Sequence, residues 1–229
     1  MFYENRSIGT MGITDKVWQY ILQILFPAIC LNCKSYLEKG QREQALCNRC
    51  FGEIELIESQ PGLMAVGLYS NSPLQALIHG LKFKHFTHTL VQIEALVSRY
   101  VRERHMSQEH YDLITYIPLH PKRERSRGFN QAELIAEILG RVLGLPVSPT
   151  LKRIRETKEQ SSIKGTEMRL QNVAGCFAVD GEYSLRSKNV ILVDDVYTSG
   201  ATTSEAIKTL RGRGAANCVV FVLARGDRQ

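Results

Sequence analysis

The sequence contains no hydrophobic run near its N-terminus that is long enough to cross a lipid bilayer. The longest such stretch, VWQYILQILFPAIC, is interrupted by Gln19 and Gln23 and stopped by Pro27. A membrane-spanning helix needs about 20 predominantly apolar residues, so this stretch is too short. The preceding residues include Glu4 and Asp15, and no small-residue cleavage site follows a clean apolar core, which argues against a secretory signal. We therefore expect a cytoplasmic protein.

The same stretch has the periodicity of a helix. Val17, Ile21, Ile24 and Leu25 recur at helical spacing. This pattern predicts a helix that packs on the body of the protein. A helix that lies on a membrane surface or binds a partner is the alternative.

Two further absences narrow the possibilities. The sequence has no internal repeat, and its six histidines show no paired spacing of the kind that metal sites use. With 229 residues and 44% hydrophobic composition, the chain can bury a core of one full domain with an appendage. The net charge of +6 suits an anionic partner such as nucleic acid, a nucleotide or a phosphorylated metabolite, but many ordinary soluble proteins carry it too.

Four of the six cysteines form two close pairs. CLNC and CNRC, separated by thirteen residues, supply Cys30, Cys33, Cys47 and Cys50. Two such pairs can place four thiolates around one tetrahedral zinc, and four protein ligands leave no open position, so the role would be structural. Disulfides are the alternative, which a reducing cytosol disfavours. The other two, Cys176 and Cys218, stand among apolar neighbours and are expected in the core.

The remainder of the chain alternates between strand-like and helix-like segments. Strands are predicted over 63–69, 112–118, 189–193 and 217–225, and helices over 72–82, 89–104, 131–144 and 202–214. Asn130 and Glu133 resemble a capping box at the start of the third helix. The basic segment 119–130 and the charged segment 145–179 are predicted as loops, the latter mobile and functional. This alternation predicts an open, mainly parallel α/β sheet with helices on both faces.

The segment VILVDDVYTSGATT combines an aliphatic strand, two acids and a hydroxyl-rich turn. Ligands of parallel sheets bind beyond the carboxyl ends of strands, and a glycine-containing turn at a helix N-terminus favours a phosphate. The carboxylates of Asp194 and Asp195 would repel that phosphate unless they accepted hydrogen bonds from another part of the ligand, such as the vicinal hydroxyls of a sugar. A ribose 5-phosphate satisfies both halves. A magnesium site of a phosphatase or kinase is the alternative.

This motif resembles the phosphoribosyl diphosphate (PRPP) site of type I phosphoribosyltransferases. Nearly the whole chain is similar to the ComF family, which includes the ComFC-like proteins of bacterial natural transformation. The resemblance rests on LFPAICLNC with its second CxxC, LIHGLKFK, IPLHPKRERSRGFNQAE, RIRETKEQSS with the later RLQN, and ILVDDVYTSGATT. Only Met1 to about Thr14 falls outside it. With the short link at ESQPG, where Pro61 and Gly62 act as breakers, we expect an N-terminal helix and zinc module over 1–60 and a phosphoribosyltransferase-like domain over 61–229.

The resemblance also implies roles for individual residues. Asp194 and Asp195 would hold the ribose hydroxyls. The turn that would hold the 5-phosphate consists of Thr198, Ser199, Gly200, Ala201 and Thr202. The loop that would hold the diphosphate consists of Pro118, Leu119 and His120.

The resemblance implies in addition that the segment from Arg155 to Arg169 is a flexible loop that closes over PRPP. Magnesium would accompany the diphosphate, because its charge must be offset. If transfer occurs, Arg155, Lys158 and Arg169 would stabilise the departing diphosphate. No obvious general base is present, so the motif specifies a ligand more closely than a reaction.

The basic segment after the diphosphate loop has two interpretations. Its residues Lys122, Arg123, Arg125, Arg127 and Phe129 combine cations with an aromatic ring, as in sites for single-stranded DNA. The same cations could instead bind the diphosphate, or the segment could be purely structural.

Two functions are therefore predicted. In the first, the protein binds PRPP and handles incoming single-stranded DNA during transformation, with competence helicases or DNA-processing proteins as partners. The alternative is a metabolic phosphoribosyltransferase that loads a base or amine onto ribose 5-phosphate. A PRPP-sensing regulator without catalysis is a third interpretation. No N-terminal catalytic cysteine or second large domain is present, which argues against an enzyme that works from glutamine.

Overall fold

The computed structural model describes residues 27–81, 86–157, 163, 165–180 and 183–227. The helix predicted around residues 17–25 and the predicted cation Lys158 lie outside the described residues. Among the described residues, no helix combines the length and the apolarity that a bilayer crossing requires.

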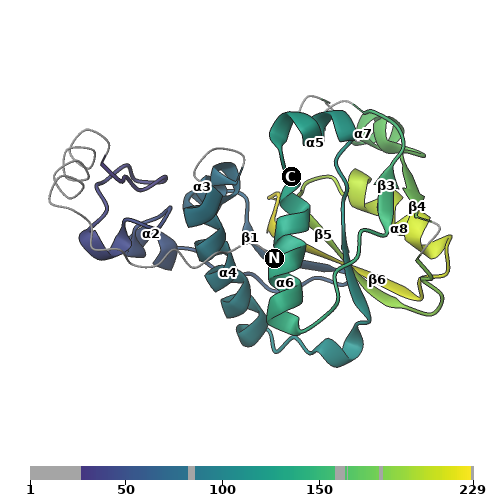
Figure 1. The fold of residues 1–229 in the computed structure, drawn as a ribbon, viewed down its shortest axis with the longest axis horizontal. Coiled ribbons are helices and arrows are strands. Elements are labelled where there is room, and N and C mark those ends of the chain that lie inside the picture. Colours follow the sequence, from purple (N-terminus) through teal and green to yellow (C-terminus); the bar gives the residue numbers. More distant parts are fainter. Residues whose placement is uncertain (1–26, 82–85, 158–162, 164, 181–182, 228–229) are drawn as a thin grey trace, which may run out of the picture.

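A four-stranded parallel sheet forms the centre of the molecule (Figure 1). Its strands, in spatial order, are β1 (Leu63–Leu68), β6 (Asn217–Arg225), β5 (Asn189–Tyr197) and β2 (Leu113–Tyr116). Every neighbouring pair is parallel, as predicted. Strand β5 extends beyond its predicted end at Val193, because Asp194 still pairs with Val222 of β6. The two aspartates therefore belong to the last part of the strand.

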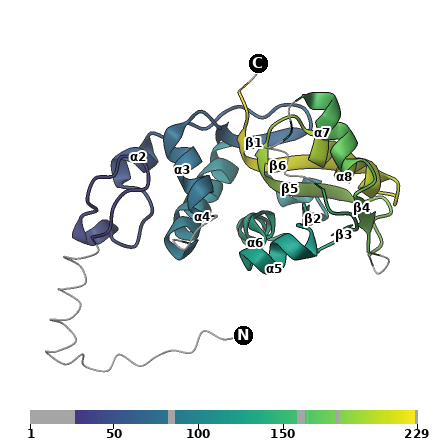
Figure 2. The same ribbon diagram turned by 90° about the horizontal axis from the view of Figure 1, so that it is seen from above.

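Helices cover both faces of this sheet, as predicted (Figure 2). One face packs against α3 (Ser72–Gly80), α4 (Phe86–Glu103) and α6 (Gln131–Leu143), and the other packs against α8 (Ala201–Arg211). Alternating residues of β5 supply the two faces: Ile191 and Val193 join the first core, whereas Val190 and Leu192 join the second. Cys176 and Cys218 are buried in the second core, which confirms their predicted place.

The basic segment that was predicted to be a loop contains a helix, α5 (Pro121–Arg127). The loop prediction was wrong because this helix has no apolar stripe and is defined by its ends instead. The His120 side chain accepts from the Lys122 amide at the start, Pro121 occupies the first turn, and Gly128 ends the helix with φ of 84°. Short polar helices of this kind leave no periodic signal.

The predicted start of α6 is confirmed, although its cap differs from a capping box. The Asn130 side chain accepts from the Ala132 amide and donates to the Ile117 carbonyl, which fixes the helix to the end of β2. Glu133 accepts from the Tyr116 hydroxyl at 2.6 Å. Its carboxylate therefore serves the packing of α6 on β2.

The described residues of the segment 145–179 form more secondary structure than predicted. It contains β3 (Leu151–Arg153), α7 (Thr166–Val173) and β4 (Phe177–Val179). Strands β3 and β4 pair in antiparallel register as a second, two-stranded sheet. Buried Leu151 and Phe177 join the core beneath α8, so the ends of the segment are anchored in the body of the protein.

The cysteine-rich segment packs against α3 and α4 (Figure 1). It contains α2 (Asn48–Gly52) and the short 3-10 helix η1 (Lys39–Gln41). A second 3-10 helix, η2 (Gln108–His110), lies elsewhere in the chain and precedes β2. The buried residues Leu46 and Ile54 of the cysteine-rich segment belong to the same core cluster as Leu77 of α3. The buried side chain of Gln92, on α4, accepts from the amides of Ala45 and Leu46 and donates to the Leu46 carbonyl. The division into residues 1–60 and 61–229 stays a prediction, but these two parts share one core.

Candidate functional site

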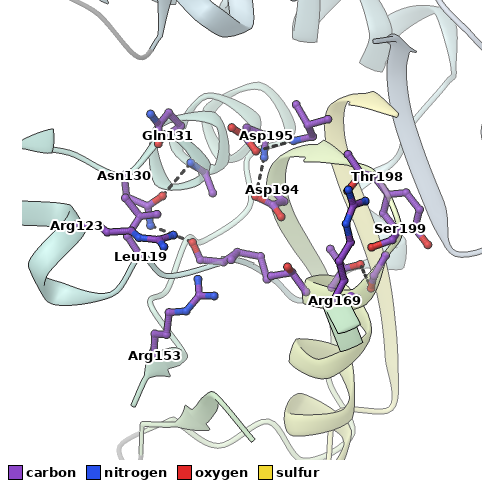
Figure 3. Close-up of a pocket in the computed structure, with 18 of the residues that line it drawn as sticks. Leu119, Arg123, Asn130, Gln131, Arg153, Arg169, Asp194, Asp195, Thr198 and Ser199 are labelled. Atoms are coloured by element: carbon purple, nitrogen blue, oxygen red, sulfur yellow. Dashed lines mark hydrogen bonds between the residues drawn. The ribbon is translucent and has the colours of Figure 1, made fainter. Parts of the chain in front are cut away.

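A cleft of about 520 Å³ lies at the carboxyl ends of the central strands. Its walls come from the end of β5 and the turn after it, the α5–α6 region, β3 and α7 (Figure 3). This is the position at which ligands of open parallel sheets bind. This one cleft is lined by all seven residues that were predicted to hold the ribose hydroxyls and the 5-phosphate: Asp194, Asp195, Thr198, Ser199, Gly200, Ala201 and Thr202.

The turn from Thr198 to Thr202 leads directly into α8. Gly200 adopts φ of 74°, and a Cβ atom at this position would lie 2.3 Å from the Tyr197 hydroxyl. Only glycine fits, because both the backbone conformation and the close approach exclude a side chain. Amide groups at the start of α8 and the positive end of its dipole favour an anion here. The turn is therefore suited to a phosphate group.

The two aspartates form the strand side of the cleft. Burial raises the pKa of the Asp194 carboxyl above its usual range, and the negative charge of Asp195 raises it further. The Asp195 amide donates to Asp194 at 2.9 Å, and the Val196 amide donates to Asp195 at 2.7 Å. Each carboxylate thus keeps acceptor capacity for a ligand hydroxyl, since one backbone bond uses only part of it.

Four arginines line the same cleft as these carboxylates: Arg123, Arg127, Arg153 and Arg169. Arg153 is held by contacts with three other residues. Its guanidinium lies 5.3 Å from the centre of the Phe177 ring and donates to the Thr157 hydroxyl at 2.7 Å and to the Pro118 carbonyl at 3.4 Å. Burial lowers its pKa. The four cations outnumber the two carboxylates, so the cleft favours a ligand with several negative charges.

The chain is similar to known proteins over much of its length. The phosphoribosyl transferase domain model matches residues 128–229. Competence protein F of Haemophilus influenzae is 29% identical over 218 residues, which cover 89% of this chain and 93% of that protein. DNA utilization protein YhgH of Salmonella typhimurium is 30% identical over 182 residues, covering 78% of this chain and 77% of that protein.

The chain belongs to the ComF family. Competence protein ComFC of Bacillus subtilis is 41% identical over 118 residues, which cover 51% of this chain and 45% of that protein. The domain match and the parallel sheet flanked by helices give this ComF-family chain the type I phosphoribosyltransferase fold. The predicted resemblance and fold class are thereby confirmed.

The predicted diphosphate loop contributes unevenly to the cleft of the ComF-family chain. Leu119 lines it, whereas His120 caps α5 and Pro118 offers its carbonyl to Arg153. Arg155 does not line the cleft in this structure. It donates to the carbonyls of Asn172 and Ala174 at the end of α7.

The structure divides the predicted DNA-binding residues into two groups. Arg123 and Arg127 line the cleft, with Arg123 donating to the Thr157 carbonyl at 2.7 Å. Lys122 and Arg125 are exposed on α5, and Lys122 pairs with Glu156 at 2.9 Å. Phe129 is half-buried. Only the second pair of cations remains on the outer surface of α5.

The sequence analysis missed Arg153 and Gln131 as residues of the cleft. Arg153 is one of several cations in a segment read as a loop, and its position depends on Phe177, 24 residues later in the antiparallel pairing. Gln131 was read as an ordinary first residue of a helix. Its place directly after the Asn130 cap at a strand's carboxyl end was the available signal, because helix N-termini converge on such clefts.

The four paired cysteines form a candidate metal centre outside the cleft. Their sulfur atoms all lie within 4.8 Å of one another, and the Cys33 and Cys47 sulfurs are 3.8 Å apart. A tetrahedral zinc with bonds of about 2.3 Å would place sulfurs about 3.8 Å apart, whereas a disulfide needs about 2.0 Å. All four thiols are free in the structure. The cluster could therefore hold a zinc ion.

Hydrogen bonds and burial shift the pKa values of two of these thiols in opposite directions. Hydrogen bonds from Ser35 lower the pKa of Cys33 to about 6, and burial raises the pKa of Cys50 to about 12. The Asn32 side chain donates to the Cys50 sulfur at 3.4 Å, which supports charge on that buried atom. The donor set thus fits a metal that binds thiolates.

Proposed function

We propose that the chain binds PRPP together with magnesium in the cleft and acts in the cytoplasm in the uptake or use of DNA, where it handles single-stranded DNA. The observation that carries the first part is the arrangement of one phosphate-type turn and two strand-end carboxylates in a single cleft. The turn from Thr198 to Thr202 suits the 5-phosphate, and Asp194 and Asp195 suit the ribose hydroxyls.

The opposite wall supports a ligand with a second anionic group. Arg123, Arg127 and Arg153 line the cleft together with the aspartates, and the bonds of Arg153 hold its charge in place without a ligand. Such preset charges stabilise negative charge at little reorganisation cost. When bound, magnesium would offset part of the diphosphate charge, and the diphosphate oxygens would be its main ligands.

The part of the proposal that concerns DNA rests on the relatives and on the surface of α5. The relatives are named for competence and for DNA utilization. Lys122 and Arg125 provide exposed positive charge beside the cleft, as phosphate binding requires. Competence helicases or DNA-processing proteins would be the protein partners.

PRPP binding is tested by calorimetric titration of the chain with PRPP in the presence of magnesium. We expect the wild type to bind, and Asp195→Asn to bind at least about tenfold more weakly, because each hydrogen bond to a charged group contributes about 1.5–3 kcal/mol. Asp180→Asn is the matched control, since Asp180 pairs with Lys152 and does not line the cleft. Wild-type protein that ignores PRPP would refute this part.

DNA handling is tested separately by the binding of a labelled single strand at several salt concentrations. Each neutralised phosphate contributes a slope of about −0.7 in log affinity against log salt. We expect the Lys122→Ala, Arg125→Ala variant to bind more weakly with a shallower slope. Arg141→Ala is the control, because Arg141 is an exposed cation on α6 paired with Glu94. Equal losses in both variants would contradict a specific role of α5.

A metabolic phosphoribosyltransferase would use the same cleft, as the description of the matched domain suggests. Diphosphate release from PRPP distinguishes the two functions. Release that requires a free base or amine and is unaffected by DNA would favour the metabolic enzyme. PRPP binding that changes the affinity for single strands would favour the role with DNA.

A further inference from the structure

The C-terminal end of α8 gathers cations that are far apart in the sequence. They are the exposed residues Arg186, Lys208, Arg211 and Arg213, which together form the α8-end surface. None of the four forms an ion pair with another described residue. On α5, by contrast, Lys122 is paired with Glu156. The α8-end surface therefore presents positive charge that the described part of the protein does not offset.

Backbone contacts hold the two segments of this surface together. Gly214, in the turn after α8, has φ of 97°, and a Cβ atom there would lie 3.2 Å from the Arg186 Cα atom. The Ser187 amide donates to the Gly214 carbonyl at 2.9 Å, and the Gly214 amide donates to the Arg211 carbonyl at 2.9 Å. Lys208 and Arg211 are three residues apart on α8 and so lie on the same side of the helix. The four cations thus share one region of the surface.

This region lies at the opposite end of the sheet from the cleft. Helix α8 begins in the turn after the carboxyl end of β5, and residues 212–216 lead from its end into the amino end of β6. Residues 186–188 lead into the amino end of β5, where Asn189 pairs with Asn217. None of the four cations lines the cleft. A partner can therefore bind here while the cleft is occupied.

The helix dipole explains only part of this charge. Lys208 and Arg211 lie in the last turn of α8, where the dipole favours a cation by about 0.3–1 kcal/mol. Arg186 and Arg213 lie outside the helix. Like charges held close together repel each other and disfavour the compact state, unless an anion offsets them. A ligand with several negative charges accounts for the arrangement.

The surroundings indicate which kind of polyanion fits. None of the exposed large apolar side chains of the described residues lies in the segments 183–188 or 207–216. A membrane surface would require apolar side chains that insert between lipids, and the stacking of bases would require an exposed aromatic ring. Exposed cations without such groups match the repeated phosphates of a nucleic-acid backbone, which bind through charge alone.

We propose that the α8-end surface binds the phosphate backbone of a nucleic acid, independently of its bases. The inference rests on the proposed function for the identity of the polyanion, DNA. It goes beyond that function, because it places a contact at the far end of the sheet from both the cleft and α5.

The test measures binding of a labelled single strand of DNA to the full chain at several salt concentrations. Arg186→Ala, Arg213→Ala removes two cations without changing α8. With a slope of about −0.7 per neutralised phosphate, we expect the slope to become shallower by about 1.4 and the affinity at about 0.1 M salt to fall on the order of tenfold or more. Arg102→Ala, Arg141→Ala is the matched control, since it removes two exposed cations from α4 and α6. Equal losses in both variants would overturn the proposal.

Two further measurements separate charge from structure and backbone from bases. Arg186→Lys, Arg213→Lys keeps the charge and should bind as the wild type does, whereas a loss as large as that of the alanine variant would assign the arginines a structural role. Thermal unfolding shows that each variant is folded at the temperature of the assay. The alanine variant should lose equally for a strand of abasic sites, and a loss confined to strands that carry bases would refute backbone binding. A loss for poly-glutamate but not for DNA would assign the surface to an acidic polypeptide instead.

The outcomes distinguish this inference from the proposed function. If Lys122→Ala, Arg125→Ala weakens DNA binding and Arg186→Ala, Arg213→Ala does not, the α8-end surface is refuted and the proposed function stands. The reverse result supports the α8-end surface and refutes the role of α5. Wild-type protein that binds DNA but not PRPP refutes the PRPP part of the proposed function, and the variants still decide the role of the surface. Wild-type protein that binds PRPP but no DNA refutes the surface and leaves the PRPP part intact.

Discussion

Replacing Asp194 by asparagine is expected to stabilise the unliganded protein and to remove its response to PRPP. Burial and the charge of Asp195 raise the pKa of the Asp194 carboxyl, so the folded protein ionises this group only at an electrostatic cost. Asparagine keeps the shape and the acceptor oxygen but carries no charge. The residue would thus be unfavourable for stability and necessary for binding.

The expected shifts in Tm follow from the length of the chain and from the coupling between ligand binding and folding. Relief of a strained functional position typically gains about 0.5–2 kcal/mol, and for a domain of this length each kcal/mol shifts Tm by about 2–4 °C. We therefore expect Asp194→Asn to raise Tm of the unliganded chain by about 1–8 °C. PRPP at a hundredfold excess over its Kd adds about 2.7 kcal/mol to the wild type, or about 5–11 °C. The variant should gain little of this.

The pH dependence has a defined sign. Because the pKa of Asp194 is higher in the folded than in the unfolded protein, the cost is absent below the unfolded value of about 3.9 and grows as pH rises toward the folded value. The difference in Tm between variant and wild type should be small near pH 4 and larger at pH 7. Scanning calorimetry across this range measures it. A variant that is less stable than wild type at pH 7, or a difference independent of pH, would refute the reasoning.

Three further predictions concern other parts of the molecule. Chelation of zinc should lower Tm of the whole chain in one calorimetric transition, because Cys30 and Cys50 lie in the core cluster shared with α3 and α4; two separate transitions would contradict this. Arg153→Lys should destabilise the protein by about 1–3 kcal/mol in urea unfolding, because lysine cannot bond Thr157 and Pro118 together, and an unchanged midpoint would count against it. Hydrogen bonds from the Asn189 amide and Lys188 lower the pKa of Asp112. The contribution of Asp112 to stability is therefore present at neutral pH and lost as the solution is acidified. Asp112→Asn should reduce this acid sensitivity, as urea titrations at pH 3 to 6 would show.

Much of the fold could be predicted because strong local patterns agree with tertiary structure. The alternating aliphatic residues of β5, the turn around Gly200 and the spacing of the four cysteines each require particular residue types at fixed positions. Such requirements leave a signal in a single sequence. The parallel sheet followed from strands and helices that alternate along the chain.

The cationic wall of the cleft could not be predicted because it depends on contacts between distant segments. Helix α5 lacks apolar residues, so its capping residues alone define it, and a loop is the default reading of such a basic run. Arg153 reaches the cleft only because β3 pairs with β4 and places Phe177 beneath its guanidinium. The orientation of Gln131 follows from its contact with Arg127, one helix earlier.

The amide of Gln92 imposes a condition on any attempt to divide this chain. Its three bonds to residues 45 and 46 imitate a peptide group of a neighbouring strand. A chain that began after residue 60 would bury or expose this amide without its partners and would uncover the apolar surface of α3 and α4 against which Leu46 packs. Such a fragment should aggregate, whereas a cysteine segment borrowed from a relative should be accepted if its backbone keeps the positions of residues 45 and 46, because Gln92 bonds only backbone atoms there. The two parts should therefore be expressed as one chain.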